Sequence, residues 1–499
     1  MVWLPLMCLA GLALRLPALA FGLPDLNHPD EPANVGVGVA MVDHGTVNPR
    51  YFSYPSLMYD VIAFVTRVQR TISGHPGAGG GITKPATGIG HTSDPRLFLA
   101  LRLISLLLSV GTCLLVYVAV RRTTGARWIA ALAGLALAVA PLLVTNGVFV
   151  TPDVYSEFFT AAALLGAIAI ARRSMLSDYV WTGLAAGLAV GSKFNTVIVV
   201  VAVLVAHIAC HRRAFVRPRP LLALLYFVVC TFAAFFVTSP AALTDTPAFV
   251  KGALFEVHHY ASGHPGQQGG SAVFYLSTVF HDGPVLLIGA VAAGLALFAG
   301  RYRKEIAVVG GYAVCYLVLI GTQFVHFDRN ALPLYPALAI LLGLAVSTGT
   351  GAIRRLFADR PEHANYATVA AGVVVSLAVL AVPLLGSLTV PATLDDTART
   401  QARDWLTAHV PAGSTVVDES YGPYLGGAGF HVDYPAFAVS EPVPADAAAI
   451  VLTQQGSGRF TDQAQYPGEY ADYRSLLRIY CTGATFTSGP WVRVLVPCR

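Results

Sequence analysis

Charged residues are scarce in this sequence. Lys, Arg, Asp and Glu together make up 12% of its 499 residues, about half the share that soluble proteins carry. Hydrophobic residues make up 55%, and they occur in runs long enough to cross a bilayer. This composition excludes an ordinary soluble protein and predicts a polytopic, α-helical membrane protein.

Cysteine is also sparse, with seven in the whole chain. Most of them lie in apolar segments, where cysteine behaves as a small apolar side chain. Only Cys481 and Cys498 fall in the polar C-terminal part. An oxidising compartment would allow these two to pair, but the sequence leaves open whether their geometry permits a disulfide.

The apolar runs predict about eleven transmembrane helices. They lie near residues 3–21, 97–120, 127–147, 154–171, 179–191, 196–211, 220–239, 284–300, 306–322, 331–350 and 366–390. The two runs between 179 and 211 are short, so we expect them to be tilted or re-entrant.

The distribution of basic residues predicts the orientation of these spans. With a cytoplasmic N-terminus, every short inside loop is basic, as the positive-inside rule requires. The inside cations are Arg121, Arg122, Arg127, Arg172, Arg173, Arg212, Arg213, Arg217, Arg219, Arg301, Arg303, Lys304, Arg354, Arg355 and Arg360. The net charge of +5 therefore reflects topology, and we expect no nucleic-acid partner.

The first apolar segment has an alternative interpretation. Ala18-Leu19-Ala20 resembles a small-residue cleavage site, as in a signal peptide. Against this, the segment has no basic n-region and contains Arg15. In either case residue 30 emerges on the extracytoplasmic side.

Two loops of the predicted membrane domain, residues 1–390, are long enough to have structure of their own. The loop 22–96 contains an amphipathic stretch, Pro55 to Val68, which is too short to span and is expected to lie in the membrane interface. The other is the loop 241–283. Both lie on the predicted extracytoplasmic side, together with most of the Asp and His residues of the loops.

The tail, residues 391–499, returns to a soluble composition and is long enough for a small domain. The predicted elements are a helix at 396–409 and strands at 414–418, 448–453 and 491–496. We therefore expect a small α/β extracytoplasmic domain.

The run Leu26-Asn27-His28-Pro29-Asp30-Glu31-Pro32 is the most informative stretch. It places two adjacent carboxylates at the edge of a membrane, where charge is costly and usually functional. The alternative is that Asp30 or Glu31 caps the helix that follows, since an acidic residue before proline is a helix-start signal.

Four further motifs accompany this pair. They are Thr151-Pro152-Asp153, the segment Gly187 to Phe194 with Lys193, Glu256 to Tyr260 followed by Gly263-His264-Pro265-Gly266, and Arg329 to Pro336. In order and sidedness, the set resembles the GT-C glycosyltransferases. Within that superfamily it is most similar to family 39, the protein O-mannosyltransferase and aminoarabinose-transferase group.

The resemblance implies a hexosyl- or pentosyltransferase of a bacterial plasma membrane. Such an enzyme moves a sugar from a polyprenyl-phosphate donor to a glycan, lipid or protein acceptor. A lipid-linked donor needs a pocket at the membrane surface, because its prenyl tail stays in the bilayer while the phosphosugar lies at headgroup level. The predicted extracytoplasmic loops meet at that level.

For catalysis, the resemblance implies Asp30 as the general base that deprotonates the acceptor hydroxyl. Backside attack would invert the anomeric centre, and the carboxylate would also stabilise an oxocarbenium-like transition state. Glu31 would serve the acceptor side or the loop. Asp153 would face the same pocket, although Thr-Pro-Asp also forms a good helix N-cap.

The leaving phosphate calls for cationic partners. Arg329 is the first candidate because a guanidinium suits bidentate phosphate contacts, followed by Lys193, His264 and Lys84. The alternatives are an interfacial charge for Arg329 and a snorkelling side chain for Lys193. The chain has Tyr54-Pro55-Ser56-Leu57 where the aminoarabinose transferases have Lys-Pro-Pro-Leu, so their phosphate contact does not transfer directly.

A divalent cation, Mg²⁺ or Mn²⁺, is a further option for this site. Asp30 and Asp153 could hold such an ion through carboxylate oxygens. Members of the resembling family differ in metal dependence, so the sequence leaves this open.

Two other classes of function fit the composition. An ion-coupled transporter also uses buried acidic residues and broken helices, and the short segments around Lys193 could form one. Against it, the second half does not repeat the first, and the acidic residues lie in loops at one face. A scaffold protein would leave the Asp30-Glu31 pair without a role.

Overall fold

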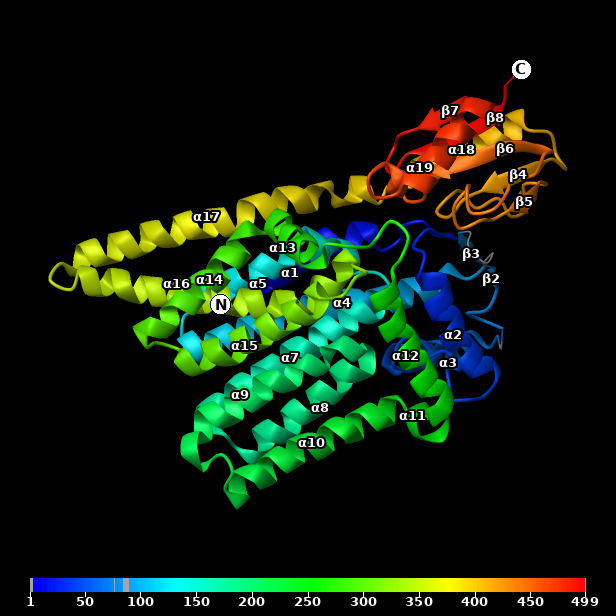
Figure 1. Ribbon diagram of the computed structural model, residues 1–499. Helices are drawn as coiled ribbons and strands as arrows, with labels where there is room; N and C mark the ends of the chain where they lie inside the picture. Colours follow the sequence, from blue (N-terminus) through cyan, green and yellow to red (C-terminus); the bar gives the residue numbers. More distant parts are fainter. Residues whose placement is uncertain (1–2, 76, 84–88, 499) are drawn as a thin grey trace.

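The computed structural model describes residues 3–75, 77–83 and 89–498. It has a bundle of roughly parallel helices and, beyond one end of the bundle, a separate sheet unit formed by the C-terminal residues (Figure 1). The long helix α17 (Pro361–Thr393) runs along the side of the bundle and leads into this unit.

Among the described residues, seven helical segments are long and apolar enough to cross a membrane. They contain α4 (Pro95–Thr124), α7 (Pro152–Arg173), α9 (Val199–His211), α10 (Pro218–Thr238), α15 (Arg303–Gly321), α16 (Tyr335–Leu356) and α17. An eighth is reached if α13 (Ser271–Asp282) and α14 (Pro284–Ala299), which meet at 108°, count as one broken span. The chain is therefore an integral membrane protein.

The remaining apolar helices are shorter. They are α1 (Trp3–Arg15), α5 (Arg127–Ala138), α6 (Pro141–Asn146) and α8 (Leu176–Ser192). The weakly predicted pair between 179 and 211 corresponds to α8 and α9, which are separated by a break at Lys193 and a 3₁₀ turn, η2 (Phe194–Ile198). The number of eleven spans remains a prediction, because several of these helices are too short to cross on their own.

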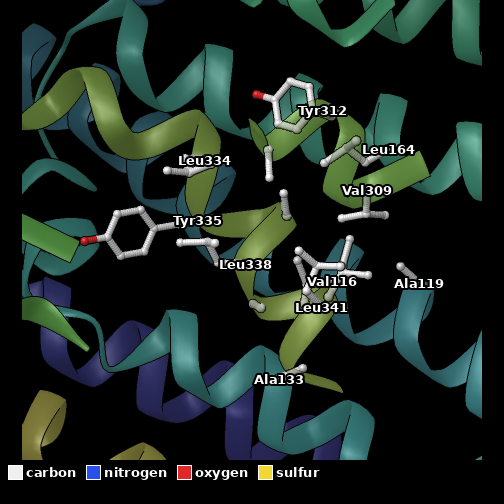
Figure 2. Packing of buried hydrophobic residues seen from close by; sticks show 14 of the residues in the cluster. Val116, Ala119, Ala133, Leu164, Val309, Tyr312, Leu334, Tyr335, Leu338 and Leu341 are labelled. Carbon is white, nitrogen blue, oxygen red and sulfur yellow. The ribbon is translucent and has the colours of Figure 1, made fainter. Parts of the chain in front are cut away.

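The core of the bundle forms around α16, which is buried along most of its length. Figure 2 shows aromatic and branched side chains of α15 and α16 packed against small residues of α4 and α5, such as Ala119 and Ala133. Small residues let helix backbones approach closely in a membrane. This packing fixes the segment η4 (Asp328–Leu334), which directly precedes α16.

Basic residues gather at one end of the bundle. Arg122, Arg173 and Arg355 lie in the last turns of α4, α7 and α16. Near them, Arg172 donates to the carbonyl of Thr123. The opposite end carries α2, α3 and α12 (Figure 1). The charge pattern predicts that this opposite end is extracytoplasmic.

The segment 22–96 forms a compact layer at that opposite end. It contains α2 (Glu31–Asp43), α3 (Leu57–Ser73) and a three-stranded antiparallel sheet of β1 (Asp25–Leu26), β3 (Gly90–Thr92) and β2 (Ile82–Thr83). Helix α3 buries one face and exposes Phe64, Val68 and Ile72 on the other. The predicted amphipathic helix is thus present, and it extends beyond its predicted end.

The loop 241–283 is also mostly helical. It contains α11 (Ala241–Thr244), α12 (Thr246–Ser262) and α13. Between α12 and α13 lies a short turn, residues 263–270, which pairs with the segment after α15.

The C-terminal unit is the small α/β unit that the sequence predicts. Its sheet has the order β5-β4-β6-β8-β7, with β5, β4 and β6 parallel and the rest antiparallel. The strands are β4 (Thr415–Asp418), β5 (His431–Asp433), β6 (Ala447–Thr453), β7 (Tyr480–Phe486) and β8 (Val492–Pro497). The helices are α18 (Thr397–His409) and α19 (Pro467–Ile479). Cys481 and Cys498 form a disulfide.

Candidate active site

Asp30 and Glu31 point into different surroundings although they are neighbours. Asp30 immediately precedes α2, and its side chain keeps 32% of its surface exposed. Glu31 is the first residue of α2, and its side chain is fully buried. Successive positions of a helix turn by about 100°, so one carboxylate faces the pocket and the other faces the bundle.

Glu31 is held by Arg102 of α4. The guanidinium donates from Nε to Oε1 at 3.0 Å and from Nη2 to Oε2 at 2.6 Å. Its third nitrogen donates to the carbonyls of Leu19 and Phe21. Burial alone would raise the pKa of Glu31, but the charge and hydrogen bonds of Arg102, together with His28 and the Val150 N–H, hold that pKa below its usual value. Glu31 is therefore a carboxylate locked in a buried ion pair.

The same pair reaches the loop that precedes α7. The backbone N–H of Val150 donates to Glu31 at 3.0 Å, and Asn34 of α2 donates to the carbonyl of Val150. These bonds tie the start of α2 to the start of α7. As a result, Asp30 and Asp153 are carried on two segments that share one buried anchor.

His28 fixes the turn that carries Asp30. Its ring packs against Phe149 with 4.3 Å between centroids, and its Nδ1 accepts the backbone N–H of Asp30 at 3.3 Å. Burial lowers the pKa of His28, so the neutral ring keeps an unprotonated nitrogen for this bond. His28 thus shapes the loop rather than supplying charge.

Asp153 lies in the first turn of α7 and is almost fully buried. Its Oδ1 accepts from Lys193 Nζ at 2.6 Å, and the same ammonium donates to Asn330 Oδ1 at 2.7 Å. Lys193 reaches this position because it stands at the break after α8. The lysine therefore points into the pocket and does not snorkel to the surface.

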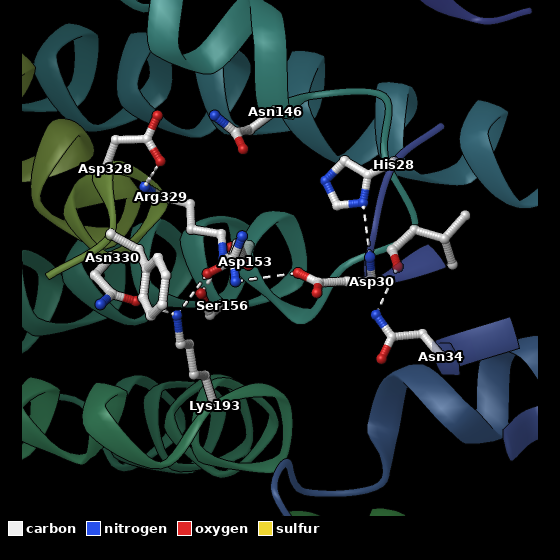
Figure 3. A network of polar contacts seen from close by, with 12 residues as sticks. His28, Asp30, Asn34, Asn146, Asp153, Ser156, Lys193, Asp328, Arg329 and Asn330 are labelled. Carbon is white, nitrogen blue, oxygen red and sulfur yellow. Dashed lines mark hydrogen bonds and ion pairs between the residues drawn. The ribbon is translucent and has the colours of Figure 1, made fainter. Parts of the chain in front are cut away.

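Arg329 bridges the two aspartates (Figure 3). Its Nη2 lies 3.1 Å from Asp30 Oδ2, and its Nε lies 3.8 Å from Asp153 Oδ2. The guanidinium also stacks over the ring of Phe327 at 4.8 Å. The order Asp30, Arg329, Asp153, Lys193 is a chain of alternating charges whose formal sum is zero.

Tyrosine hydroxyls lie close to this chain of charges. Tyr260 of α12 lies 3.4 Å from the side chain of Asn330, which donates to Tyr275 at 3.1 Å. Burial, reinforced by the nearby charge of Asp30, raises the pKa of Tyr54 well above its usual value. The Tyr54 hydroxyl therefore remains protonated, and tyrosine hydroxyls can donate to or accept from the hydroxyls of a sugar.

The comparisons with known proteins agree on one architecture. Residues 96–237 match the profile of a family described as dolichyl-phosphate-mannose-protein mannosyltransferase. ArnT from Cupriavidus metallidurans bound to undecaprenyl phosphate aligns over 99% of this chain and 98% of its own, with 16% identity and a TM-score of 0.55. No curated protein sequence matches the chain significantly.

Archaeal oligosaccharyltransferases are similar as well. The Archaeoglobus fulgidus enzyme in complex with Zn and sulfate has a TM-score of 0.57 at 14% identity, over 98% of this chain and 72% of its own. AglB from the same organism, with an inhibitory peptide and a dolichol-phosphate, has a TM-score of 0.53 at 13% identity. There the alignment covers 83% of this chain and 62% of AglB. This chain has the GT-C glycosyltransferase fold.

The GT-C resemblance seen in the sequence is thus confirmed for the fold. Within it, four of the predicted site residues meet: Asp30, Asp153, Lys193 and Arg329. Glu31 points away from them, and Lys84 lies outside the described residues. His264 is connected to these four residues through Phe327. Its ring packs on Phe327 at 5.2 Å between centroids, and the Arg329 guanidinium packs on the same phenylalanine ring.

Two residues of the site were missed by the sequence reasoning. Asn330 lies within the predicted Arg329 to Pro336 motif but was not predicted as a site residue, and its side-chain oxygen accepts a hydrogen bond from Lys193. Arg102 was not considered, although it stands inside the apolar run 97–108. A lone cation within a membrane span usually has a buried partner, so this signal predicts a buried carboxylate near Arg102 without identifying which one.

The pocket does not fit a bound metal ion. Both oxygens of Asp153 face cations, Lys193 and Arg329. Across the described ranges, no three His, Cys, Asp or Glu side chains come together as a ligand set. Asp30 and Asp153 are therefore paired with cationic side chains and are not arranged as ligands of a divalent cation.

Proposed function

We propose that this protein is a membrane glycosyltransferase that moves a sugar from a polyprenyl-phosphate donor to an acceptor hydroxyl on the extracytoplasmic face. One observation carries the proposal. The partly exposed carboxylate of Asp30 lies 3.1 Å from the guanidinium of Arg329, at the solvent-accessible end of the chain of alternating charges. Glycosyl transfer from a phosphate donor needs a base for the acceptor hydroxyl and a cation for the leaving phosphate, and this pair supplies one of each.

The donor class has independent support from an apolar groove. Side chains of α4, α7, α8 and α10 enclose a volume of about 680 Å³, lined among others by Phe158, Phe159, Leu188 and Val237. Thr238 is one of the lining residues. It packs closely against Gly191, two residues before Lys193, because a Cβ added to Gly191 would lie 2.7 Å from the Thr238 hydroxyl oxygen. A prenyl tail in this groove would bring its phosphate to the pocket. The solved relatives bound to undecaprenyl phosphate and dolichol-phosphate support the same class.

In this mechanism, Arg329 changes partners when the donor binds. A phosphate oxygen takes the guanidinium that pairs with Asp30 in the free protein, since phosphate is a strong bidentate partner for arginine. Asp30 then accepts the proton of the acceptor hydroxyl. Such general-base catalysis contributes roughly a hundred- to ten-thousand-fold.

The buried half of the chain stays in place during this exchange. Asp153 and Lys193 neutralise each other at the base of the pocket, so they can orient the sugar without adding net charge. Attack from the side of Asp30 and departure toward Arg329 would invert the anomeric centre, through an oxocarbenium-like transition state. Glu31 takes no part in the reaction, because both of its oxygens are already bonded.

The transporter alternative is less well supported. The four charged groups lie at one end of the bundle rather than midway along it, and the similar folds are those of glycosyltransferases. A transporter would also have no need for the exchangeable pair of Asp30 and Arg329.

The decisive experiment replaces Asp30 with Asn in purified protein supplied with decaprenyl-phosphate-linked sugars and a panel of acceptors. We expect turnover to fall by roughly a hundredfold or more, while binding of decaprenyl phosphate is retained. The control is Asp43→Asn at the other end of α2, where the carboxylate pairs with Arg70. Wild-type turnover by D30N would remove Asp30 as the base, and absence of polyprenyl-phosphate binding by the wild type would overturn the proposed function.

A further inference from the structure

The C-terminal unit contacts the bundle along two seams. At the first, Asp25 accepts from His91 at 2.7 Å and pairs with Arg403 of α18 at 3.3 Å. The ring of His91 stacks on Tyr424 of the unit. This seam lies beside the small sheet of β1 and β3 (Figure 1).

The second seam is centred on Arg459, in the 3₁₀ turn η5 (Ser457–Phe460) after β6. Within the unit, Nη2 donates to the hydroxyl of Tyr421 at 2.8 Å, and the guanidinium lies over the rings of Tyr421 and Phe437. Across the seam, Nη1 donates to the carbonyl of Pro265 at 3.4 Å. Gln465 adds a second bond, from Nε2 to the carbonyl of Gln268 at 2.9 Å.

Glycine at position 266 makes this approach possible. Its φ is +76°, and a Cβ there would lie 2.6 Å from the Cβ of Arg459. Any other residue would be strained in its backbone and would push the arginine away. The turn 263–270 and Arg459 are therefore fitted to each other.

The other side of this turn holds the segment that carries Arg329. Gly269 N–H donates to the carbonyl of Phe324, and His326 N–H donates to the carbonyl of Gln267. The ring of His264 packs on Phe327. The turn 263–270 is thus a spacer between the C-terminal unit and the segment 324–329.

We propose that Arg459 is a positioning residue of the active site. It clamps the turn 263–270 to the C-terminal unit, and the turn in turn presses on Phe327, over which the Arg329 guanidinium lies. Arg459 thereby holds the Arg329 guanidinium in the position in which it would bind the donor phosphate. This inference rests on the proposed function, because it assigns Arg329 to a phosphate.

The charges around the turn are compatible with this role. The imidazole of His264 lies near the cations Arg459 and Arg329. Burial, aided by Arg459 and by His259 and Arg329, lowers the pKa of His264 to about 4. The ring is therefore neutral near pH 7 and can pack in a cationic neighbourhood without repulsion.

The test compares Arg459→Ala with Arg403→Ala, which removes the Asp25 contact of the first seam and leaves the second seam intact. Two quantities are measured on the full chain in detergent: hydrogen exchange of the peptides 262–270 and 323–330, and the affinity for decaprenyl phosphate. We expect R459A to speed hydrogen exchange in both peptides and to weaken decaprenyl phosphate binding about tenfold. A tenfold loss is the change expected if roughly one residue of backbone must be ordered when the ligand binds. R403A should leave both quantities unchanged.

Arg459→Lys supplies a second variant in case R459A does not fold. A lysine keeps the charge but not the forked geometry, so its effect should lie between wild type and alanine. Unchanged exchange in R459A and R459K, or an equal effect of R403A, would overturn the positioning role. If the wild type does not bind decaprenyl phosphate, the proposed function fails, while the exchange data still decide whether Arg459 holds the turn.

Discussion

Two ion pairs begin at adjacent residues and have opposite surroundings. The pair of Glu31 and Arg102 is fully buried on both sides, whereas Asp30 and Arg329 keep 32% and 21% of their side chains exposed. The chemical groups are the same, a carboxylate and a guanidinium. Burial decides what each pair can do, because a buried charge that loses its partner has no water to replace it.

The buried pair, which we call the anchor, joins three segments of the bundle. Arg102 belongs to α4, Glu31 to α2, and Val150 precedes α7. The exposed pair, which we call the mouth, is the part that a ligand can reach. The anchor ties together the segments that carry Asp30 and Asp153, and in the proposed mechanism Arg329 of the mouth passes from a carboxylate to a phosphate.

Breaking the anchor should have the largest effect. Arg102→Leu leaves Glu31 buried without a counter-charge, and loss of one partner of a buried pair costs about 3–5 kcal/mol. We expect a large fall in the thermal unfolding temperature in detergent and in the yield of folded protein. Arg96→Leu, at the exposed start of the same helix, is the matched control.

The double variant Glu31→Leu with Arg102→Leu sharpens this prediction. It removes both charges together, and a buried pair replaced by apolar residues of similar volume is often close to neutral in stability. The double variant should therefore be more stable than R102L alone. Equal unfolding temperatures of R102L and wild type would show that the anchor does not contribute to the stability of the fold.

The base of the mouth should show a smaller, coupled effect. Asp153→Asn and Lys193→Met each remove one of the two charges of a buried pair, since Asp153 Oδ1 and Lys193 Nζ are 2.6 Å apart. Contacting residues couple by about 0.5–3 kcal/mol in double-mutant cycles. Thermal unfolding of both single variants and of the double variant should give a clearly non-additive sum, whereas simple additivity would contradict the pairing.

The sequence was sufficient to place Asp30, Asp153, Lys193 and Arg329 at one face. Each follows or precedes an apolar run, and the loop charges predict that this face is extracytoplasmic. The resemblance gave Asp30 and Glu31 different roles, but the sequence could not show that Glu31 is locked in a buried ion pair, because its partner Arg102 is 71 residues away in the chain. Such a long-range partner leaves no local pattern.

Helix boundaries show a similar division. The predicted helix at 396–409 and the three predicted strands of the tail are present nearly as expected, because turn residues and alternation mark them locally. The apolar run at 284–300 gave no sign that α14 meets α13 at 108°. The break falls at Gly283-Pro284, between the end of α13 and the start of α14, but composition does not encode the angle.

The smallest effect should appear at the rim of the mouth, at His264. Its folded pKa of about 4 lies below the ordinary value of 6.5, so the unfolded chain binds the proton more readily between these values. Stability is therefore fully present above pH 6.5 and decreases as the pH falls toward 4. In His264→Gln this component is absent, so its unfolding temperature should fall less across that window than that of the wild type. The ring is only partly buried, and water screens its charge, so the difference should be smaller than for the anchor. His75→Gln, which removes an exposed imidazole, is the control, and identical pH profiles of H264Q and wild type would contradict the burial of His264 beside Arg459 and Arg329.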